Sequence, residues 1–318
     1  MAHKIILDTD PGIDDAMAIA YAIAHPDIEL LALTTIFGNV LTHEATANAL
    51  KLVEAWGSNA DVAEGEAGPL SIPALEPSYS VHGRNGFGEV EMPASTRSPH
   101  KLDAVSYITD MTKRHPGEIT ICAVGPLTNL ARLLERDPDV VGRVKSVVVM
   151  GGAVHSPGNV TPVAEANFWH DPHAADMVLA ASWPLVLAPL DCTMPVLFTP
   201  DFMQTLAKES PRFGTPLAAM AEFYTRFYRS HQGLGGCVPH DVMALSWLTV
   251  PGAFRLQKGA LAVLTEGAGI GQSIFQPGGT SSQSRAFDGR PDHLVMVDTD
   301  PKMFLADYLR VLMDASAG

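Results

Sequence analysis

Four carboxylates fall within eight residues near the start of the chain. The stretch reads Asp8-Thr9-Asp10-Pro11-Gly12-Ile13-Asp14-Asp15 and directly follows an apolar run. Crowded carboxylates repel one another and raise one another's pKa unless a cation joins them. Hard divalent cations take several oxygen ligands, about six to eight in the case of Ca²⁺. The spacing therefore predicts a metal site. A helix cap at Asp14 and a helix-dipole contact at Asp15 would account for only two of the four acids.

Two other acidic motifs begin in a similar way. A calcium-binding EF-hand loop starting at Asp8 would need glycine at Ile13 and glutamate at Ile19, so this motif is excluded. The haloacid-dehalogenase phosphatases also carry Asp-x-Asp after their first strand, but usually with threonine or valine where Gly12 stands. Such an enzyme would use Asp8 as its nucleophile and would need Mg²⁺ and a lysine near the phosphate. No later apolar run leads into a recognisable lysine motif, which weakens this second enzyme class.

Short apolar, β-branched runs alternate with helix-like stretches along the chain. The expected strands are Lys4–Leu7, Ile28–Thr35, Glu118–Val124, Val144–Met150, Leu185–Leu190, Leu261–Thr265 and Leu294–Val297. The expected helices are Asp14–Ala24, His43–Trp56, Leu102–Arg114, Leu127–Glu135, Pro172–Ala180, a block from Pro216 to Trp247, and Lys302–Met313. This alternation predicts an α/β fold with a mostly parallel central sheet flanked by helices. Ligands of such sheets bind at the carboxyl ends of the strands, where the acid cluster lies.

A segment rich in proline and glycine runs from Gly68 to Pro99 with little periodicity. A loop of this length in a compact fold is usually functional or mobile. Gly83, Gly86 and Gly88 lie around His82, and we expect them to give this part of the loop the freedom of a hinge.

Composition limits the classes of function. The chain has 318 residues, 47% hydrophobic and 18% charged, and no linker or repeat marks a boundary, so we expect one domain over residues 1–318. The net charge of −14, without any lysine or arginine cluster, disfavours binding of nucleic acid. A small neutral substrate fits better. The N-terminal residues resemble neither a signal peptide nor a membrane span. The cysteines Cys122, Cys192 and Cys237 form no CxxC pair, so we expect a cytoplasmic protein without disulfides.

The acidic stretch resembles the opening of the inosine–uridine-preferring nucleoside hydrolases, whose signature is Asp-x-Asp-Pro-Gly-x-Asp-Asp. Three further segments resemble this family, occur in the family's order and together span most of the sequence. They are Thr34-Thr35-Ile36-Phe37-Gly38-Asn39, the stretch from Met150-Gly151-Gly152 to Glu165-Ala166-Asn167, and Pro239-His240-Asp241. The resemblance implies a Rossmann-like nucleoside hydrolase fold and cleavage of the N-glycosidic bond of ribonucleosides in salvage or catabolism. It also implies a homodimer or homotetramer.

The resemblance implies a single Ca²⁺ ion. Asp10, Asp15 and Asp241 would bind it through their carboxylates, and the main-chain carbonyl of Val124 would be a further ligand. We expect that carbonyl to be free, because Val124 ends a strand before a glycine–proline turn. Asp8 would lie behind the ligands and hold the loop in orientation.

The same resemblance implies roles in the reaction. Asp14 would take a proton from a water molecule that the cation has acidified, and His240 would protonate the leaving base. Residues gripping the ribose would be Asn39, Asn159, Glu165 and Asn167, with Met150 near the 5′ side.

Several residues keep a structural alternative. A lone histidine before a helix, such as His240, is commonly structural, although its neighbour Asp241 favours a functional role. Tyr224 and Tyr228 lie one helical turn apart and could stack on the base, relay a proton or belong to the core. His82 could cover the base or lie on the surface.

The choice between purine and pyrimidine stays open. Family members that prefer certain bases often carry an aromatic residue between the glutamate and the asparagine, and this chain has Ala166 there, with Phe168 and Trp169 after it. A ribose- or nucleoside-binding protein without catalytic activity is the alternative from another class. It would lack a base or an acid, and both Asp14 and His240 are present.

Overall fold

The computed structural model describes residues 2–281 and 284–317. The strands in this part are β1 (His3–Thr9), β2 (Ile28–Thr35), β3 (Asp61–Glu64), β4 (Ile119–Ala123), β5 (Ser146–Met150), β6 (Leu185–Ala188), β7 (Phe254–Val263), β8 (Ser273–Pro277) and β9 (His293–Thr299). Over the described residues they form one nine-stranded sheet in the order β3-β2-β1-β4-β5-β6-β9-β7-β8. The pairs from β3 to β9 are parallel, whereas β7 pairs antiparallel with β8 and β9. The mostly parallel sheet is confirmed.

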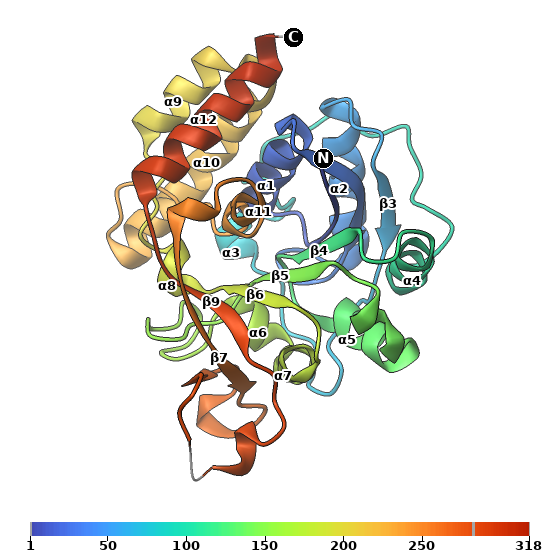
Figure 1. Ribbon diagram of the computed structural model, residues 1–318. Coiled ribbons are helices and arrows are strands. Elements are labelled where there is room, and N and C mark those ends of the chain that lie inside the picture. Colours follow the sequence, from blue (N-terminus) through green and yellow to red (C-terminus); the bar gives the residue numbers. More distant parts are fainter. Residues whose placement is uncertain (1, 282–283, 318) are drawn as a thin grey trace.

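The helices lie on both faces of this sheet (Figure 1). They are α1 (Ile13–Ala24), α2 (Thr42–Ala55), α3 (Tyr79–His82), α4 (Ala104–Arg114), α5 (Thr128–Arg136), α6 (Ala166–His170), α7 (Pro172–Ala180), α8 (Leu190–Thr193), α9 (Pro200–Glu209), α10 (Pro211–Gln232), α11 (Val242–Thr249) and α12 (Pro301–Ala317). Within residues 2–281 and 284–317, none of them is long and apolar enough to cross a membrane.

Alternate side chains of the central strands pack into two separate hydrophobic cores, one on each face of the sheet. Leu7 and Val148 pack with residues of α1, α2 and α9 to α12. Ile6 and Val147 point to the other face and pack with residues of α4, α5 and α7. Strands covered on both sides must be apolar on both sides, which is why these runs are recognisable in the sequence.

The order in which successive strands join the sheet changes direction at β1. The chain continues from β1 to β2 and β3 on one side, and returns to place β4, β5 and β6 on the other. The carboxyl ends of β1 and β4 lie side by side, with Asp8 paired to Ala123. Loops leaving adjacent strands in opposite directions open a crevice at such a point, where ligands of α/β proteins bind. The acid cluster therefore emerges at the edge of the sheet that is suited to a site.

The structure corrects several expected elements. Strands β3 and β8 and the helices α3, α6, α8 and α9 were not predicted, and β7 begins at Phe254, well before the expected Leu261. The edge strands β3 and β8 are short and half-exposed, so they lack long apolar runs. The expected block from Pro216 to Trp247 is two helices. Gly233 ends α10 in a left-handed conformation, and the following turn places His240 and Asp241 directly before α11.

Candidate active site

Helix α1 presents two acids at its first turn. The helix begins at Ile13 with Gly12 as its N-cap, and the Gly12 amide donates a hydrogen bond to Asp15 Oδ2 at 2.9 Å. The alternative that Asp14 is a helix cap is therefore wrong. Asp14 is nearly buried, and its Oδ1 atom has no hydrogen-bond partner among the described residues. A buried carboxylate oxygen without a donor requires another explanation.

Asp15 and Asp10 hold the first turn of the crevice together. Asp15 accepts hydrogen bonds from the Thr9 hydroxyl and the Asp10 amide on one oxygen, and from the Gly12 amide and the Asn39 side chain on the other. Asp10 Oδ2 accepts the Asn39 amide at 2.6 Å. Asp10 Oδ1 is buried and has no donor within the described part of the chain. The Asn39 side chain thus contacts the acid cluster directly, through its hydrogen bond to Asp15, and it also faces the crevice.

Three carboxylates converge in the crevice. Asp14, Asp15 and Asp241 each offer an oxygen atom, and these oxygens lie within 4.8 Å of one another. Burial, reinforced by Asp15, raises the pKa of Asp14 well above its usual value, and burial with the neighbouring acids does the same for Asp241. Converging buried carboxylates with unpartnered oxygens fit a divalent cation. The expected set was Asp10, Asp15 and Asp241, so the structure places Asp14 in the tight group and Asp10 beside it.

Val124 follows β4 and lies at the same crevice, almost completely buried. Its carbonyl was expected to be free, but it accepts a hydrogen bond from Asn167 Nδ2 at 2.9 Å. The same amide lies 3.2 Å from the carbonyl of Met150 at the end of β5. A carbonyl oxygen has two lone pairs, so this hydrogen bond leaves one lone pair for another ligand.

Glu165 and Asn159 shape the start of α6. Glu165 is the N-cap of this helix, and its carboxylate accepts the amides of Asn167 and Phe168. It also accepts the Gly152 amide at 2.8 Å, which fixes the glycine turn after β5. Asn159 Oδ1 accepts the Ala166 amide at 3.0 Å. These hydrogen bonds give Glu165 and Asn159 a structural role in addition to the expected contact with ribose.

Most of the predicted site residues line one pocket. The exceptions are Asp8, Asp10 and Asp15, which are fully or almost fully buried. The lining residues are Asp14, Asn39, Ser78, Val81, His82, Val124, Met150, Asn159, Val160, Glu165, Ala166, Asn167, Tyr224, Phe227, Tyr228, Gln232, His240 and Asp241. Five of the lining residues were not predicted from the sequence: Ser78, Val81, Val160, Phe227 and Gln232. Gln232 could have been found, because it follows Tyr224 and Tyr228 at the same four-residue spacing.

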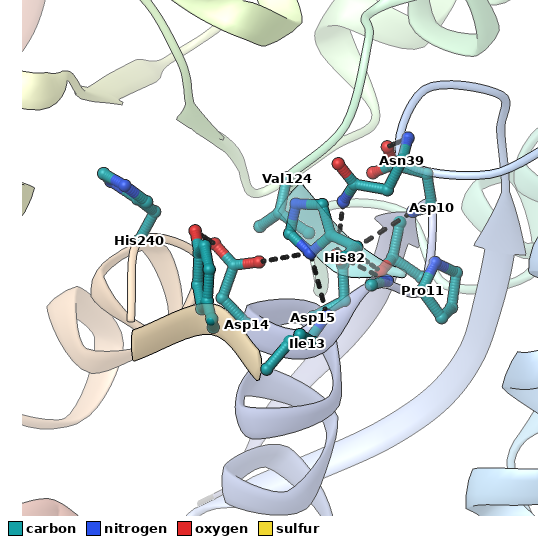
Figure 2. A network of polar contacts seen from close by, with 12 residues as sticks. Asp10, Pro11, Ile13, Asp14, Asp15, Asn39, His82, Val124 and His240 are labelled. Carbon is teal, nitrogen blue, oxygen red and sulfur yellow. Dashed lines mark hydrogen bonds and ion pairs between the residues drawn. The ribbon is translucent and has the colours of Figure 1, made fainter. Parts of the chain in front are cut away.

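His82 lies over the first turn of α1 (Figure 2). Its Nδ1 accepts the Ile13 amide at 3.1 Å and lies 3.8 Å from Asp14 Oδ1. The alternative of a surface histidine is wrong, because the ring is 5% exposed and lines the pocket. Burial, with a smaller effect of His240, lowers the pKa of His82 to about 3. The ring is therefore neutral near pH 7, and since Nδ1 accepts a hydrogen bond, Nε2 carries the proton.

Hydrogen bonds connect His240 to Asp14 through two tyrosines. His240 Nε2 lies 2.6 Å from the Tyr228 hydroxyl, which lies 3.3 Å from the Tyr224 hydroxyl. The Tyr224 hydroxyl donates to Asp14 Oδ2 at 3.3 Å. On its other side, His240 Nδ1 lies 2.7 Å from the Thr193 hydroxyl, a residue that sequence analysis missed. Burial lowers the pKa of His240 to about 3. The two tyrosines are core residues as well as members of this chain of hydrogen bonds.

Asp8 lies behind the crevice. Its Oδ1 accepts the Thr34 hydroxyl and the Asn129 amide, which link β1 to β2 and α5. Burial raises the pKa of Asp8 to about 7. A phosphatase nucleophile would have to face the pocket, and Asp8 does not line it. This position argues against the phosphatase and suits a residue that supports the loop.

Comparisons with known proteins identify the family of this chain. The family model described as inosine-uridine preferring nucleoside hydrolase matches residues 5–306. Uridine nucleosidase 1 of Arabidopsis thaliana is 38% identical over 277 residues, covering 87% of this chain and 82% of the relative. The non-specific ribonucleoside hydrolase RihC of Escherichia coli strain K12 / DH10B is 37% identical over 317 residues, covering 99% of this chain and 100% of the relative.

Solved structures give the same result. A plant nucleoside hydrolase, the PpNRh1 enzyme, matches with a TM-score of 0.92 and 33% identity over 100% of both chains. A purine-preferring ribonucleoside hydrolase from Gardnerella vaginalis matches with a TM-score of 0.91 and 30% identity, covering 98% of this chain and 99% of the other. The chain belongs to the inosine-uridine preferring nucleoside hydrolase family. It is a ribonucleoside hydrolase, an enzyme that splits nucleosides into ribose and free base with water.

Proposed function

We propose that this enzyme cleaves the N-glycosidic bond with Asp14 as general base and with a Ca²⁺ ion held by Asp10, Asp15, Asp241 and the Val124 carbonyl. The observation that carries the proposal is the convergence of buried carboxylates, with unpartnered oxygens on Asp10 and Asp14, where β1 and β4 end. A bound cation would supply a lowered pKa for a coordinated water molecule.

Asp14 is the acceptor for the proton of the attacking water. Its Oδ1 accepts no hydrogen bond from the described residues, and burial raises the pKa of its carboxyl, which makes it a stronger base than an exposed aspartate. The water oxygen bonds to the anomeric carbon as the carbon–nitrogen bond breaks. The leaving base takes the bonding electron pair and needs a proton.

His240 supplies that proton as part of a relay. Its ring is neutral at pH 7, so it can give up a proton only when it receives another. The hydrogen bonds from Asp14 through Tyr224 and Tyr228 offer a route by which the proton of the water reaches His240 Nε2. For this transfer the Tyr224 hydroxyl would turn to accept from Asp14, and the base would then replace Tyr228 as the partner of Nε2 and take the proton. The atoms balance, because the two parts of one water molecule end on ribose and on the base. His82, with a proton on Nε2, is the second candidate donor near Asp14.

The ribose is held by the residues that line the pocket opposite α10. Asn39, Asn159, Glu165 and Asn167 line the pocket and would offer amide and carboxylate groups to the hydroxyls. Met150 also lines the pocket and would lie near the 5′ side of the ribose. Holding the sugar in place removes much of the entropic cost of the attack by water.

Uridine is the substrate we propose first, because the relatives include uridine nucleosidases from two plants. We also propose a homodimer or homotetramer in the cytoplasm, formed from one domain over residues 1–318. One sheet that contains strands from both ends of the chain supports the single domain. The three free, buried cysteines suit a reducing compartment. Light scattering on the purified protein tests the oligomeric state.

Ribose release tests the proposed function directly. The enzyme should release ribose from uridine or inosine in Ca²⁺ buffer, and should stop after treatment with a chelator and recover when Ca²⁺ is added back. It should release no phosphate from p-nitrophenyl phosphate. Full ribose release by a protein freed of metal, or phosphate release as the main activity, would contradict the proposal. Tight binding of nucleoside without turnover would favour the binding protein.

A further inference from the structure

One buried amide joins two segments of the site that lie far apart in the sequence. Asn48 of α2 is 3% exposed, and its Nδ2 donates to the carbonyl of Pro11 at 3.2 Å and to the carbonyl of Asn85 at 2.9 Å. Pro11 belongs to the acidic loop, which is residues 8–15. Asn85 belongs to the turn that carries His82. Asn48 itself does not line the pocket.

The turn formed by residues 82–90 is held together by hydrogen bonds between its own residues. The Gly88 amide donates to the carbonyl of His82 at 2.7 Å, and Asn85 Oδ1 accepts the amides of Phe87 and Glu89. The Phe87 side chain is 1% exposed and packs in the core. Because these contacts join the turn to His82 and to the core, the position of His82 depends on the turn as a whole.

The three glycines of this turn adopt backbone conformations that favour glycine, and their expected role as hinges stays a prediction. Gly83, Gly86 and Gly88 have φ values of +77°, +80° and +61°, in the region that glycine adopts without strain. A Cβ atom at Gly86 would lie 2.8 Å from the Pro11 carbonyl oxygen and 2.8 Å from Asn48 Nδ2. The turn therefore packs directly on the acidic loop, with no space between them.

The two segments touch at a second point. The Ile13 amide donates to His82 Nδ1, so the turn contacts the acidic loop on both sides of Gly12. Asn48 supplies the contact at Pro11, and both groups that it binds are carbonyls, which cannot bond to each other. Without a donor at this position, the Pro11 and Asn85 carbonyls would face each other with no hydrogen bond between them, which costs free energy in a buried place.

We propose that Asn48 is a positioning residue that couples the acidic loop to His82, so that binding of a cation to the acidic loop also orders the turn at residues 82–90. The coupling to the cation rests on the proposed metal site. The geometric part, that Asn48 acts on the reaction through His82, rests on contacts alone. Asn48 touches neither substrate nor cation in this proposal.

Hydrogen exchange tests the coupling to the cation. In the unaltered enzyme, Ca²⁺ should slow exchange of the amides in residues 8–15 and in residues 82–90. In Asn48→Ala, Ca²⁺ should still slow residues 8–15, while the slowing of residues 82–90 should shrink by about tenfold, as expected for the loss of one or two buried hydrogen bonds. Val53→Ala is the matched control, since it removes buried volume from the same helix but takes away no hydrogen-bonding group. It should keep the slowing in both segments.

Two results would overturn the coupling. One is full slowing of residues 82–90 by Ca²⁺ in Asn48→Ala, and the other is loss of that slowing in Val53→Ala as well, which would mean general loosening of α2. If Ca²⁺ slows neither segment in the unaltered enzyme, the proposed metal site fails and the coupling fails with it. Absence of slowing at residues 8–15 therefore means that the metal site is wrong, whereas unchanged slowing at residues 82–90 in Asn48→Ala means that only the coupling is wrong.

A double-mutant cycle tests whether Asn48 acts through His82. As the only substitution, Asn48→Ala should lower kcat/KM for uridine by about tenfold. In a His82→Ala background it should lower kcat/KM by less than about twofold, because the residue that Asn48 positions is already gone. Asn48→Asp should behave like Asn48→Ala, since its carboxylate cannot donate to two carbonyls. Equal losses in both backgrounds would overturn the proposal and leave Asn48 a stabilising residue. Val53→Ala should lose equally little activity in both backgrounds.

Discussion

The hydroxyl oxygen of Tyr228 lies 2.6 Å from Nε2 of His240. Together with the Thr193 hydroxyl on Nδ1, this contact satisfies both nitrogens of a histidine that burial keeps neutral. A neutral ring that is bonded on both sides can relay a proton between its nitrogen partners, but it holds no spare proton of its own. The proton for the leaving base therefore depends on the groups around His240 as much as on His240 itself.

Replacement of His240 should slow cleavage only of those substrates whose leaving group needs a proton. A purine or uracil departs poorly as an anion, whereas p-nitrophenolate departs without a proton. His240→Ala should slow cleavage of uridine and inosine by about 10²–10⁴, the usual effect of losing a placed proton donor, and leave p-nitrophenyl riboside cleavage nearly intact. Steady-state rates on the three substrates provide the measurement.

Two other outcomes of that experiment have distinct meanings. Loss of all three activities would show damage at the adjacent Asp241 and contradict the role in leaving-group protonation. Normal cleavage of uridine and inosine would assign the proton to another group, with Tyr228 and His82 the nearest candidates. Tyr228→Phe keeps the core packing and removes only the hydroxyl, so it should show the same dependence on leaving group if the relay operates.

Thr193 should matter through His240 alone. Thr193→Val keeps the shape of the side chain but leaves His240 Nδ1 without its partner at 2.7 Å. A hydrogen bond of this kind contributes about 1 kcal/mol, which corresponds to about a fivefold fall in kcat/KM for uridine. Thr193→Ser keeps the hydroxyl and should retain the rate. Equal rates for the valine variant and the unaltered enzyme would exclude any effect of Thr193 on the reaction.

Without the cation, stability should fall as the pH rises from about 6.5 through 7. Burial raises the pKa of Asp8 to about 7, and burial with neighbouring charges raises the pKa of Asp10 and Asp14 well above the usual range of an aspartate. The folded protein then holds protons that the unfolded chain has lost, so the free energy of unfolding decreases with pH. His82 and His240, with pKa values lowered to about 3, act in the opposite direction only below about 6.5, where unfolded histidines gain protons.

Melting temperatures with chelator and with Ca²⁺ over this pH range provide the test. A bound cation favours ionised carboxylates, so the Ca²⁺ series should be nearly flat while the chelator series declines. Two parallel series would contradict the assignment of the cation to the acid cluster. Asp8→Asn should flatten part of the decline in chelator, because it removes one of the raised carboxyl groups.

The core of the sheet could be predicted from the sequence because its strands are covered on both faces. Val147, Val148 and Val149 are all buried, and their run is apolar throughout. The edge strand β3 reads Asp-Val-Ala-Glu and has exposed or half-exposed ends, so its composition does not distinguish it from a loop. Helix α9 did carry a start signal, because the Thr199 side chain caps it and Pro200 is its first residue.

The acids and histidines of the site could be predicted because chemistry restricts their types and because they lie in motifs. Thr193 and Asn48 could not, since each acts through a contact to a residue distant in the sequence. Thr193 is 47 positions from His240, and Asn48 is 37 positions from both Pro11 and Asn85. A threonine or an asparagine within a helix has many ordinary roles, and only the folded arrangement shows which groups these two residues contact.

The central claim is that Asp14 is the base and Asp10 a ligand of the cation, and Asp14→Asn beside Asp10→Asn tests it most directly. Because Gly12 caps α1, Asp14→Asn should leave the helix intact. We predict that its kcat for uridine falls by about 10²–10⁴ while its Kd for Ca²⁺, measured by calorimetry, changes by less than about tenfold. Asp10→Asn should instead weaken Ca²⁺ binding by about tenfold or more. Normal turnover in Asp14→Asn, or turnover restored by raising Ca²⁺, would contradict the account.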